Sequence, residues 1–133
     1  MAWKKKTKFG NIKTKLITKF GLVSFSSRLE ANTYLELEKR EKLGYITNLK
    51  LQDRLYLGPE RFQYTPDFKC LDLMTNEEFW VEAKGMECPT WRRNYRLWKN
   101  GKGPGRLEIY KGNPPKIVEV LIPKSDVCKL CGK

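Results

Sequence analysis

Two short segments carry the residue types that could perform chemistry in this sequence. The first reads Tyr64-Thr65-Pro66-Asp67, and the second, fifteen residues after Asp67, reads Glu82-Ala83-Lys84-Gly85. Alternate residues of a strand point to the same face, so Glu82 and Lys84 would share one face. If residues 67–73 and 78–84 pair as a hairpin, Asp67 lies close to Glu82. Two adjacent carboxylates suit a hard divalent ion such as Mg²⁺ or Mn²⁺, and the Ala83 carbonyl could add a backbone ligand.

Lys84 would act beside such an ion rather than bind it. Its ammonium could hold or polarise an attacking water and balance the charge on a scissile phosphate. Two structural interpretations stay open beside this one. Pro66-Asp67 could be an ordinary turn that begins a strand, and Glu82 and Lys84 could form an ion pair on an exposed strand.

Composition limits the chemistry further. The chain has 133 residues, which is the size of one domain, and no histidine. Ser-His-Asp hydrolases, histidine-metal nucleases and zinc sites that need an imidazole are therefore excluded. Lys and Arg number 27 against 15 Asp and Glu, a formal net charge of +12. This charge predicts a polyanionic partner, with nucleic acid as the first expectation and an anionic membrane surface as the lesser alternative.

The charge is unevenly distributed along the chain. Residues 1–29 carry +8, residues 30–87 carry −4 and residues 88–133 carry +8. Carboxylates beside a polyanion repel it unless a metal ion lies between them. The pattern predicts basic flanks that bind phosphates around an acidic centre that holds a cation; the alternative is a solvated, lysine-rich surface.

Periodicity and turn residues predict the elements that must position these groups. We expect a loose basic arm over about 1–19 with a short strand at 15–18, then an approach to a helix over 20–25. A helix is predicted over about 28–43 and a second over 90–99, followed by a flexible loop at 101–105. Strands are predicted at 45–49, 54–57, 62–73 with its return strand 78–84, 106–110 and 116–122. This order predicts an α/β (α+β) fold with a mixed central β-sheet flanked by helices.

The start of the first predicted helix reads Ser27-Arg28-Leu29-Glu30. This is the spacing of a capping box, with Ser27 as N-cap and Glu30 at the third helical position. The structural interpretation of Glu30 is that it completes this box and nothing else.

Together the motifs resemble the PD-(D/E)XK nuclease superfamily, with Pro66-Asp67 followed by Glu82-Ala83-Lys84 as the signature. Within it, the sequence is similar to the small phage Holliday-junction resolvases of the endonuclease I type over about residues 24–100, with weaker agreement at 107–121. Gln52 also resembles a polar site position in a family of phage nucleases, although a solvent-facing glutamine fits equally well.

The resemblance implies a restriction-endonuclease-like core in a single nuclease domain spanning 1–133. It implies a metal-dependent DNA endonuclease with Asp67, Glu82 and Lys84 as catalytic residues. Because the superfamily often places one more acidic residue on the first helix, Glu30 is a further candidate, catalytic or metal-binding. A four-way junction has two symmetric strands to cut, so a homodimer is expected.

Further binding residues are predicted in the basic flanks and the tail. Phosphate contacts are assigned to Lys4, Lys5, Lys6, Lys8, Arg92, Arg93, Arg96 and Lys99. The tail, about 123–133, contains Cys128 and Cys131, which form half of a possible zinc site. Cys70 and Cys88 could complete this site only if the fold brings the tail to them. The alternatives are a zinc ion shared by the tails of two chains, and a pair of free thiols.

We expect an intracellular protein, in the host cytoplasm if phage-encoded, because the sequence shows no signal peptide and no membrane span. Two other functions stay open. One is a non-catalytic nucleic-acid-binding protein with a zinc-knuckle-like tail, and the other is a nicking or restriction-type nuclease.

Overall fold

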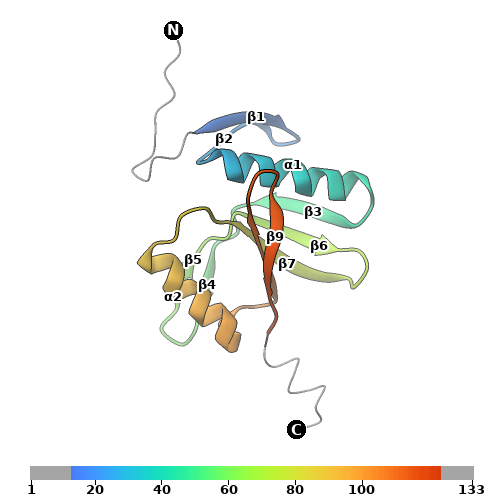
Figure 1. Ribbon diagram of the computed structural model, residues 1–133. Helices are drawn as coiled ribbons and strands as arrows, with labels where there is room; N and C mark the ends of the chain where they lie inside the picture. Colours follow the sequence, from blue (N-terminus) through green and yellow to red (C-terminus); the bar gives the residue numbers. More distant parts are fainter. Residues whose placement is uncertain (1–12, 124–133) are drawn as a thin grey trace.

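The computed structural model describes residues 13–123, in which two α-helices lie against a mixed β-sheet (Figure 1). The helices are α1 (Arg28–Lys42) and α2 (Pro89–Leu97), and a π-helical turn over Trp98–Lys102 continues α2. The strands are β1 (Thr14–Thr18), β2 (Gly21–Phe25), β3 (Ile46–Leu51), β4 (Leu55–Leu57), β5 (Phe62–Tyr64), β6 (Phe68–Asp72), β7 (Glu77–Ala83), β8 (Arg106–Lys111) and β9 (Lys116–Leu121).

The central sheet has five strands in the order β3-β6-β7-β8-β9. Neighbouring strands are antiparallel except β7 and β8, which are parallel. Parallel neighbours need a crossover connection, and α2 lies in that connection. The expectation of an α+β fold with a mixed sheet and flanking helices is confirmed at this level.

Two apolar cores lie on the two faces of this sheet. Along β7, Phe79 and Val81 face the core that α1 covers, whereas Trp80 faces the core that α2 covers. This alternation is what a strand buried on both faces produces. The strand that ends in Glu82 and Ala83 is therefore fixed from both sides.

Local signals explain the first helix. The Ser27 hydroxyl accepts a hydrogen bond from the Glu30 amide at 3.1 Å, as an N-cap does. Gly44 follows the helix with φ +85°, a left-handed conformation that glycine adopts without strain. The predicted helix over 28–43 is confirmed to within one residue.

The segment 20–25, expected to lead into a helix, instead contains strand β2, and this expectation was wrong. The strand pairs with β1 through a tight turn in which the Thr18 hydroxyl donates to the Gly21 carbonyl and accepts from the Phe20 amide. Leu16 and Val23 pair across the hairpin and pack against the α1 core. Residues 14–18 of the expected loose arm therefore form a strand, because this partly buried apolar pair packs the hairpin against the α1 core.

The second helix begins one residue before the predicted range, and the loop after it is shorter than expected. Trp91 and Trp98 are buried in the α2 core, and Tyr95 packs against it. These three aromatic side chains, spaced four and three residues apart, therefore form the face by which the helix packs into the core. A side chain at Gly103 would place Cβ 2.3 Å from the Trp98 ring, so only glycine allows the chain to pass here.

Candidate functional site

The β6–β7 hairpin brings Asp67 and Glu82 together as its register requires. Phe68 pairs with Val81, so Asp67, one residue before β6, lies opposite Glu82 near the end of β7. The Asp67 Oδ2 atom accepts a hydrogen bond from the Ala83 amide at 2.8 Å. This bond fixes the Asp67 carboxylate against the segment of chain that leads to Lys84.

Glu82 is almost completely buried, and a proton donor contacts each of its two oxygens. The Tyr64 hydroxyl, from β5, donates to Oε1 at 2.6 Å, and the Lys84 Nζ atom lies 3.4 Å from Oε2. The Lys84 ammonium also lies 5.3 Å from the centroid of the Trp91 ring on α2. Elements besides β7 therefore hold this carboxylate and its lysine in place.

Glu30 enters the same region from the first turn of α1. Its Oε2 atom accepts a hydrogen bond from the Ser26 hydroxyl at 2.6 Å, while its amide is capped by Ser27. Glu30 and Asp67 both line a pocket of about 110 Å³, together with Val23, Ser24, Phe25, Leu51 and Gln52. Glu30 and Asp67 thus line the same small pocket, although the backbone of Glu30 belongs to the helix cap.

The pKa values of all three carboxyls are raised, and Lys84 opposes this in each case. Burial raises the pKa of Asp67 well above its usual value, and the negative charges of Glu82 and Glu30 raise it further. Burial likewise raises the pKa of Glu30 and of Glu82, and the Lys84 ammonium lowers both. A bound cation would stabilise the ionised form of these carboxyls, because Lys84 is a single positive charge beside three acidic groups.

A divalent cation fits the donor set around Asp67 and Glu82. Within residues 13–123, no three Asp, Glu or Cys side chains lie close enough together to hold a metal ion as they stand. Magnesium commonly needs only one or two carboxylates, with waters and a substrate phosphate as its remaining ligands. The Asp67 and Glu82 carboxylates, with the Ala83 carbonyl as the predicted third donor, match that requirement.

Tyr64 is the residue that sequence reasoning missed. It precedes Asp67 by three positions and lies within the motif, but its contact with Glu82 depends on β5 packing under α2. The alternation of β5 was the available signal: Phe62 and Tyr64 share a face, and Tyr64 is buried there. Trp91 belongs to the α2 core, and its ring also lies beside the Lys84 ammonium.

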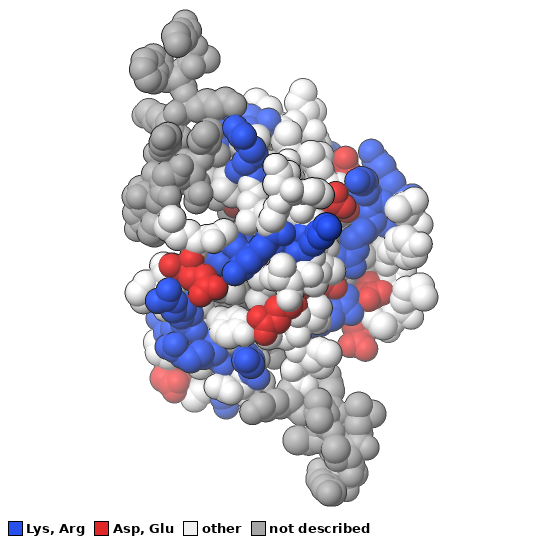
Figure 2. Space-filling model, in the orientation of Figure 1, with Lys and Arg blue, Asp and Glu red and all other residues white. Residues whose placement is uncertain are grey.

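The basic residues predicted on and next to α2 differ in their exposure to solvent and in whether they form ion pairs. Arg92, Arg96 and Lys99 are exposed, and Arg96 and Lys99 form no ion pair with any residue that the structure describes. Arg93 is half-buried, with its guanidinium 4.2 Å from the Phe62 ring centroid. Figure 2 shows Lys and Arg side chains gathered over the region that α2 occupies in Figure 1.

Several predicted binding residues lie outside the described range. These are Lys4, Lys5, Lys6, Lys8, Cys128 and Cys131. Cys70 and Cys88, the other cysteines, belong to the cores on opposite faces of the sheet. Burial raises the pKa of the Cys70 thiol to about 12, so it is a poor source of the thiolate that zinc requires. The two cysteines therefore do not form a common half-site within the described fold.

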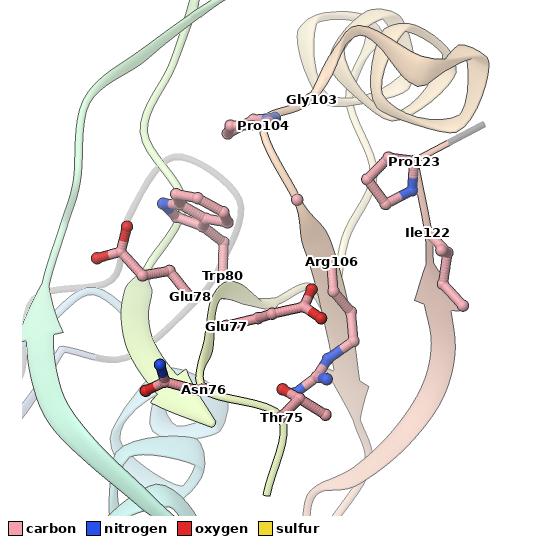
Figure 3. Close-up of a pocket in the computed structure, with 11 residues that line it drawn as sticks. Thr75, Asn76, Glu77, Glu78, Trp80, Gly103, Pro104, Arg106, Ile122 and Pro123 are labelled. Atoms are coloured by element: carbon pink, nitrogen blue, oxygen red, sulfur yellow. The ribbon is translucent and has the colours of Figure 1, made fainter. Parts of the chain in front are cut away.

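A larger pocket lies at the other end of β7 and contains none of the predicted site residues. Its volume is about 680 Å³, and it is bounded by the β6–β7 turn, the loop at 103–105 and the end of β9 (Figure 3). Glu77 and Arg106 extend into it, and the Trp80 ring forms part of its wall. Pocket volume alone would therefore not have located the carboxyl cluster, by which we mean Glu30, Asp67 and Glu82.

Comparisons with protein-family models, with curated proteins and with solved structures found no match to this chain. Among the described residues, no helix is long and apolar enough to cross a membrane.

Glu30→Gln separates the two roles of this residue. Glutamine keeps the amide that Ser27 caps and can still accept from Ser26, so we expect a thermal midpoint equal to or slightly above that of the wild type. If the negative charge of Glu30 helps to hold a metal ion or a water beside Asp67, the substitution should slow metal-dependent cleavage of DNA by about tenfold or more. Single-turnover kinetics measure this rate. Wild-type cleavage by a normally folded Glu30→Gln protein would return Glu30 to the helix cap alone.

Gln52 occupies a strained backbone position at the rim of the small pocket. Its φ is +48°, and its amide donates to the Asp67 carbonyl at 2.9 Å. A left-handed conformation costs a residue with a side chain roughly 1–2 kcal/mol, so we expect Gln52→Gly to be at least as stable as the wild type. Gln52→Val should be clearly less stable, because a β-branched side chain fits this conformation worst. Denaturant unfolding of the three proteins measures both differences.

Proposed function

We propose that this protein is a metal-dependent DNA endonuclease with a restriction-endonuclease-like core. One observation carries the proposal: a protein with a net charge of +12 gathers Asp67, Glu82 and Glu30 from separate elements around a single lysine. Burial raises the pKa of all three carboxyls, so placing them within electrostatic reach of one lysine costs stability at neutral pH rather than adding to it. Phosphodiester hydrolysis does require carboxylates for a metal ion and a cation near the phosphate.

Each of these groups has a distinct part in the proposed reaction. A bound Mg²⁺ would lower the pKa of a water ligand and stabilise negative charge on the phosphate. Asp67, oriented by the Ala83 amide, and Glu82, oriented by Tyr64, supply the anionic oxygens that would hold it. Lys84, held between Glu82 and the Trp91 ring, can donate a hydrogen bond to the attacking water or to a phosphate oxygen.

The substrate proposed is branched DNA, with a four-way junction as the form the resemblance favours. The exposed Arg96 and Lys99 lie on or next to α2, which also places Trp91 against Lys84, so phosphate contacts there would be coupled to the site. Two cuts in a symmetric junction need two sites, and a homodimer would supply them.

The experiment is cleavage of a labelled four-way junction and of a linear duplex with matching arms. Each substrate is incubated with the full-length protein, with Mg²⁺, with Mn²⁺ and with EDTA. We expect metal-dependent cutting of the junction, little cutting of the duplex, and affinity that falls steeply with salt. Equal cutting of both substrates would indicate a nicking or restriction-type enzyme. Binding in EDTA without cutting under any metal would contradict the proposal and indicate a non-catalytic nucleic-acid-binding protein.

A further inference from the structure

The hairpin formed by β4 and β5 has two faces with different roles. Leu55 pairs with Tyr64 and Leu57 with Phe62, and this face packs toward the α2 core. Tyr56, which pairs with Gln63, lies on the opposite face and is 49% exposed. Because Tyr64 also donates its hydroxyl to Glu82, the inner face fixes the hairpin relative to the carboxyl cluster.

The outer face, together with exposed residues next to it in the sequence, forms a polar, basic and aromatic surface. We define the hairpin strip as five exposed residues: Gln52, Arg54, Tyr56, Arg61 and Gln63. The Arg61 guanidinium lies 4.9 Å from the centroid of the Tyr56 ring. Neither Arg54 nor Arg61 forms an ion pair with a residue in the described range 13–123. The acidic neighbour Asp53 points elsewhere, accepting from the Trp80 indole N–H at 2.9 Å.

The hairpin strip begins at the candidate site. Gln52 lines the pocket that Glu30 and Asp67 share, and its amide is bonded to the Asp67 carbonyl. Tyr56 follows four residues later, which is no more than about 14 Å of extended chain. A strand of nucleic acid with one phosphate at the carboxyl cluster would therefore have nucleotides beside Tyr56.

We propose that the hairpin strip binds an unpaired nucleotide of the substrate, with the Tyr56 ring stacked on the base and Arg54 and Arg61 beside the backbone. The proposal rests on the proposed function in naming the substrate of the same site. An aromatic ring stacks on any base whose face is free, so recognition is by structure and not by sequence. In paired DNA both faces of an interior base are already stacked. The hairpin strip thus selects branched DNA in which a base near the bond to be cut is unpaired, or is splayed from its partner at the branch point.

The test measures binding without cutting, so it does not depend on catalysis. Full-length protein in EDTA is titrated into a single-stranded oligonucleotide containing 2-aminopurine and into a blunt duplex. We expect Tyr56→Ala to weaken single-strand binding by about fivefold or more and to remove the quenching of 2-aminopurine. Tyr56→Phe keeps the ring and should bind and quench as the wild type does. Binding to the duplex should be nearly unchanged in both variants.

Tyr45→Ala is the matched control, because Tyr45 is 54% exposed and lies just before β3. It should bind both DNAs as the wild type does, and circular dichroism should show that all three variants are folded. The proposal is overturned if Tyr56→Ala binds single strands as well as Tyr45→Ala does. It is also overturned if the wild type does not bind single strands, or if Tyr56→Ala weakens duplex binding equally. If Tyr56→Ala weakens single-strand binding but the wild type never cuts DNA, the role of the hairpin strip in binding stands and the proposed endonuclease function is rejected.

Discussion

Asp67→Asn should lose metal-dependent cleavage almost completely while it binds DNA at least as well as the wild type. The substitution removes an anionic metal ligand, and a catalytic metal contributes several kcal/mol of transition-state stabilisation. We therefore expect the single-turnover rate to fall by about a hundredfold or more. The side-chain oxygen of asparagine can still accept a hydrogen bond from the Ala83 amide, so the hairpin is preserved. Loss of a negative charge near the phosphates accounts for the unchanged or tighter binding.

The same variant should be more stable than the wild type at neutral pH. The folded-state pKa of Asp67 is raised, so the folded protein holds this proton more tightly than the unfolded chain does. The stabilisation that comes from this bound proton is fully present below the pKa of Asp67 in the unfolded chain. It is lost as the pH rises through the pKa of Asp67 in the folded protein. Asparagine does not titrate, so its thermal midpoint should exceed that of the wild type at pH 7, and the difference should shrink toward pH 4. A variant that cuts normally, or one less stable than the wild type at pH 7, would contradict the assignment.

Lys84→Ala should have the second large effect, on both chemistry and stability. Lysine cannot bind a cation, so its loss should reduce the rate at saturating Mg²⁺ by about a hundredfold and leave metal affinity less affected. Without its ammonium, the pKa values of Glu30, Asp67 and Glu82 all rise. The variant should therefore lose on the order of 1–3 kcal/mol of stability at pH 7 and recover part of it in acid, as measured by denaturant unfolding.

Lys69→Ala is the control for this experiment. Lys69 is 20% exposed against 24% for Lys84, lies 5.5 Å from the centroid of a tryptophan ring (that of Trp80), and pairs with Glu78 at 3.1 Å. It thus reproduces the surroundings of Lys84 without facing the carboxyl cluster. We expect it to retain cleavage. Full rescue of Lys84→Ala by excess Mg²⁺, or an equal loss of cleavage in Lys69→Ala, would refute the role given to Lys84.

Local patterns were enough to predict most of the elements and the pairing of Asp67 with Glu82. The Ser27 cap, Gly44 and the β6–β7 turn act within a few residues, so their signals are contained in the sequence around them. The segment 20–25 was misread because its apolar residues gain a buried face only through pairing with β1 and packing on α1. A single strand with weak alternation does not reveal its partner.

The candidate site was predicted where it depends on one hairpin and was incomplete where it depends on distant elements. The contact of Tyr64 with Glu82 needs the β4–β5 hairpin packed under α2, and the position of Lys84 needs Trp91. Neither contact follows from spacing along the chain. The sequence left two roles open for Glu30, in a capping box or in the site. Its carboxylate accepts from Ser26 and lines a pocket with Asp67, and both contacts depend on how α1 lies on the sheet.

The parallel pairing of β7 with β8 across α2 has a consequence for when the carboxyl cluster forms during folding. Pairings that join distant parts of a chain are the slow steps of folding, because loop-closure entropy is lost before the contacts form. The Trp91 ring that lies beside Lys84 belongs to α2, within that crossover connection. Glu30 belongs to α1, the helix that precedes the central sheet in the sequence. We therefore expect the carboxyl cluster to be complete only after β7 and β8 have paired. During refolding, we expect the gain of metal-dependent protection from unfolding to follow, and never to precede, the burial of Trp91.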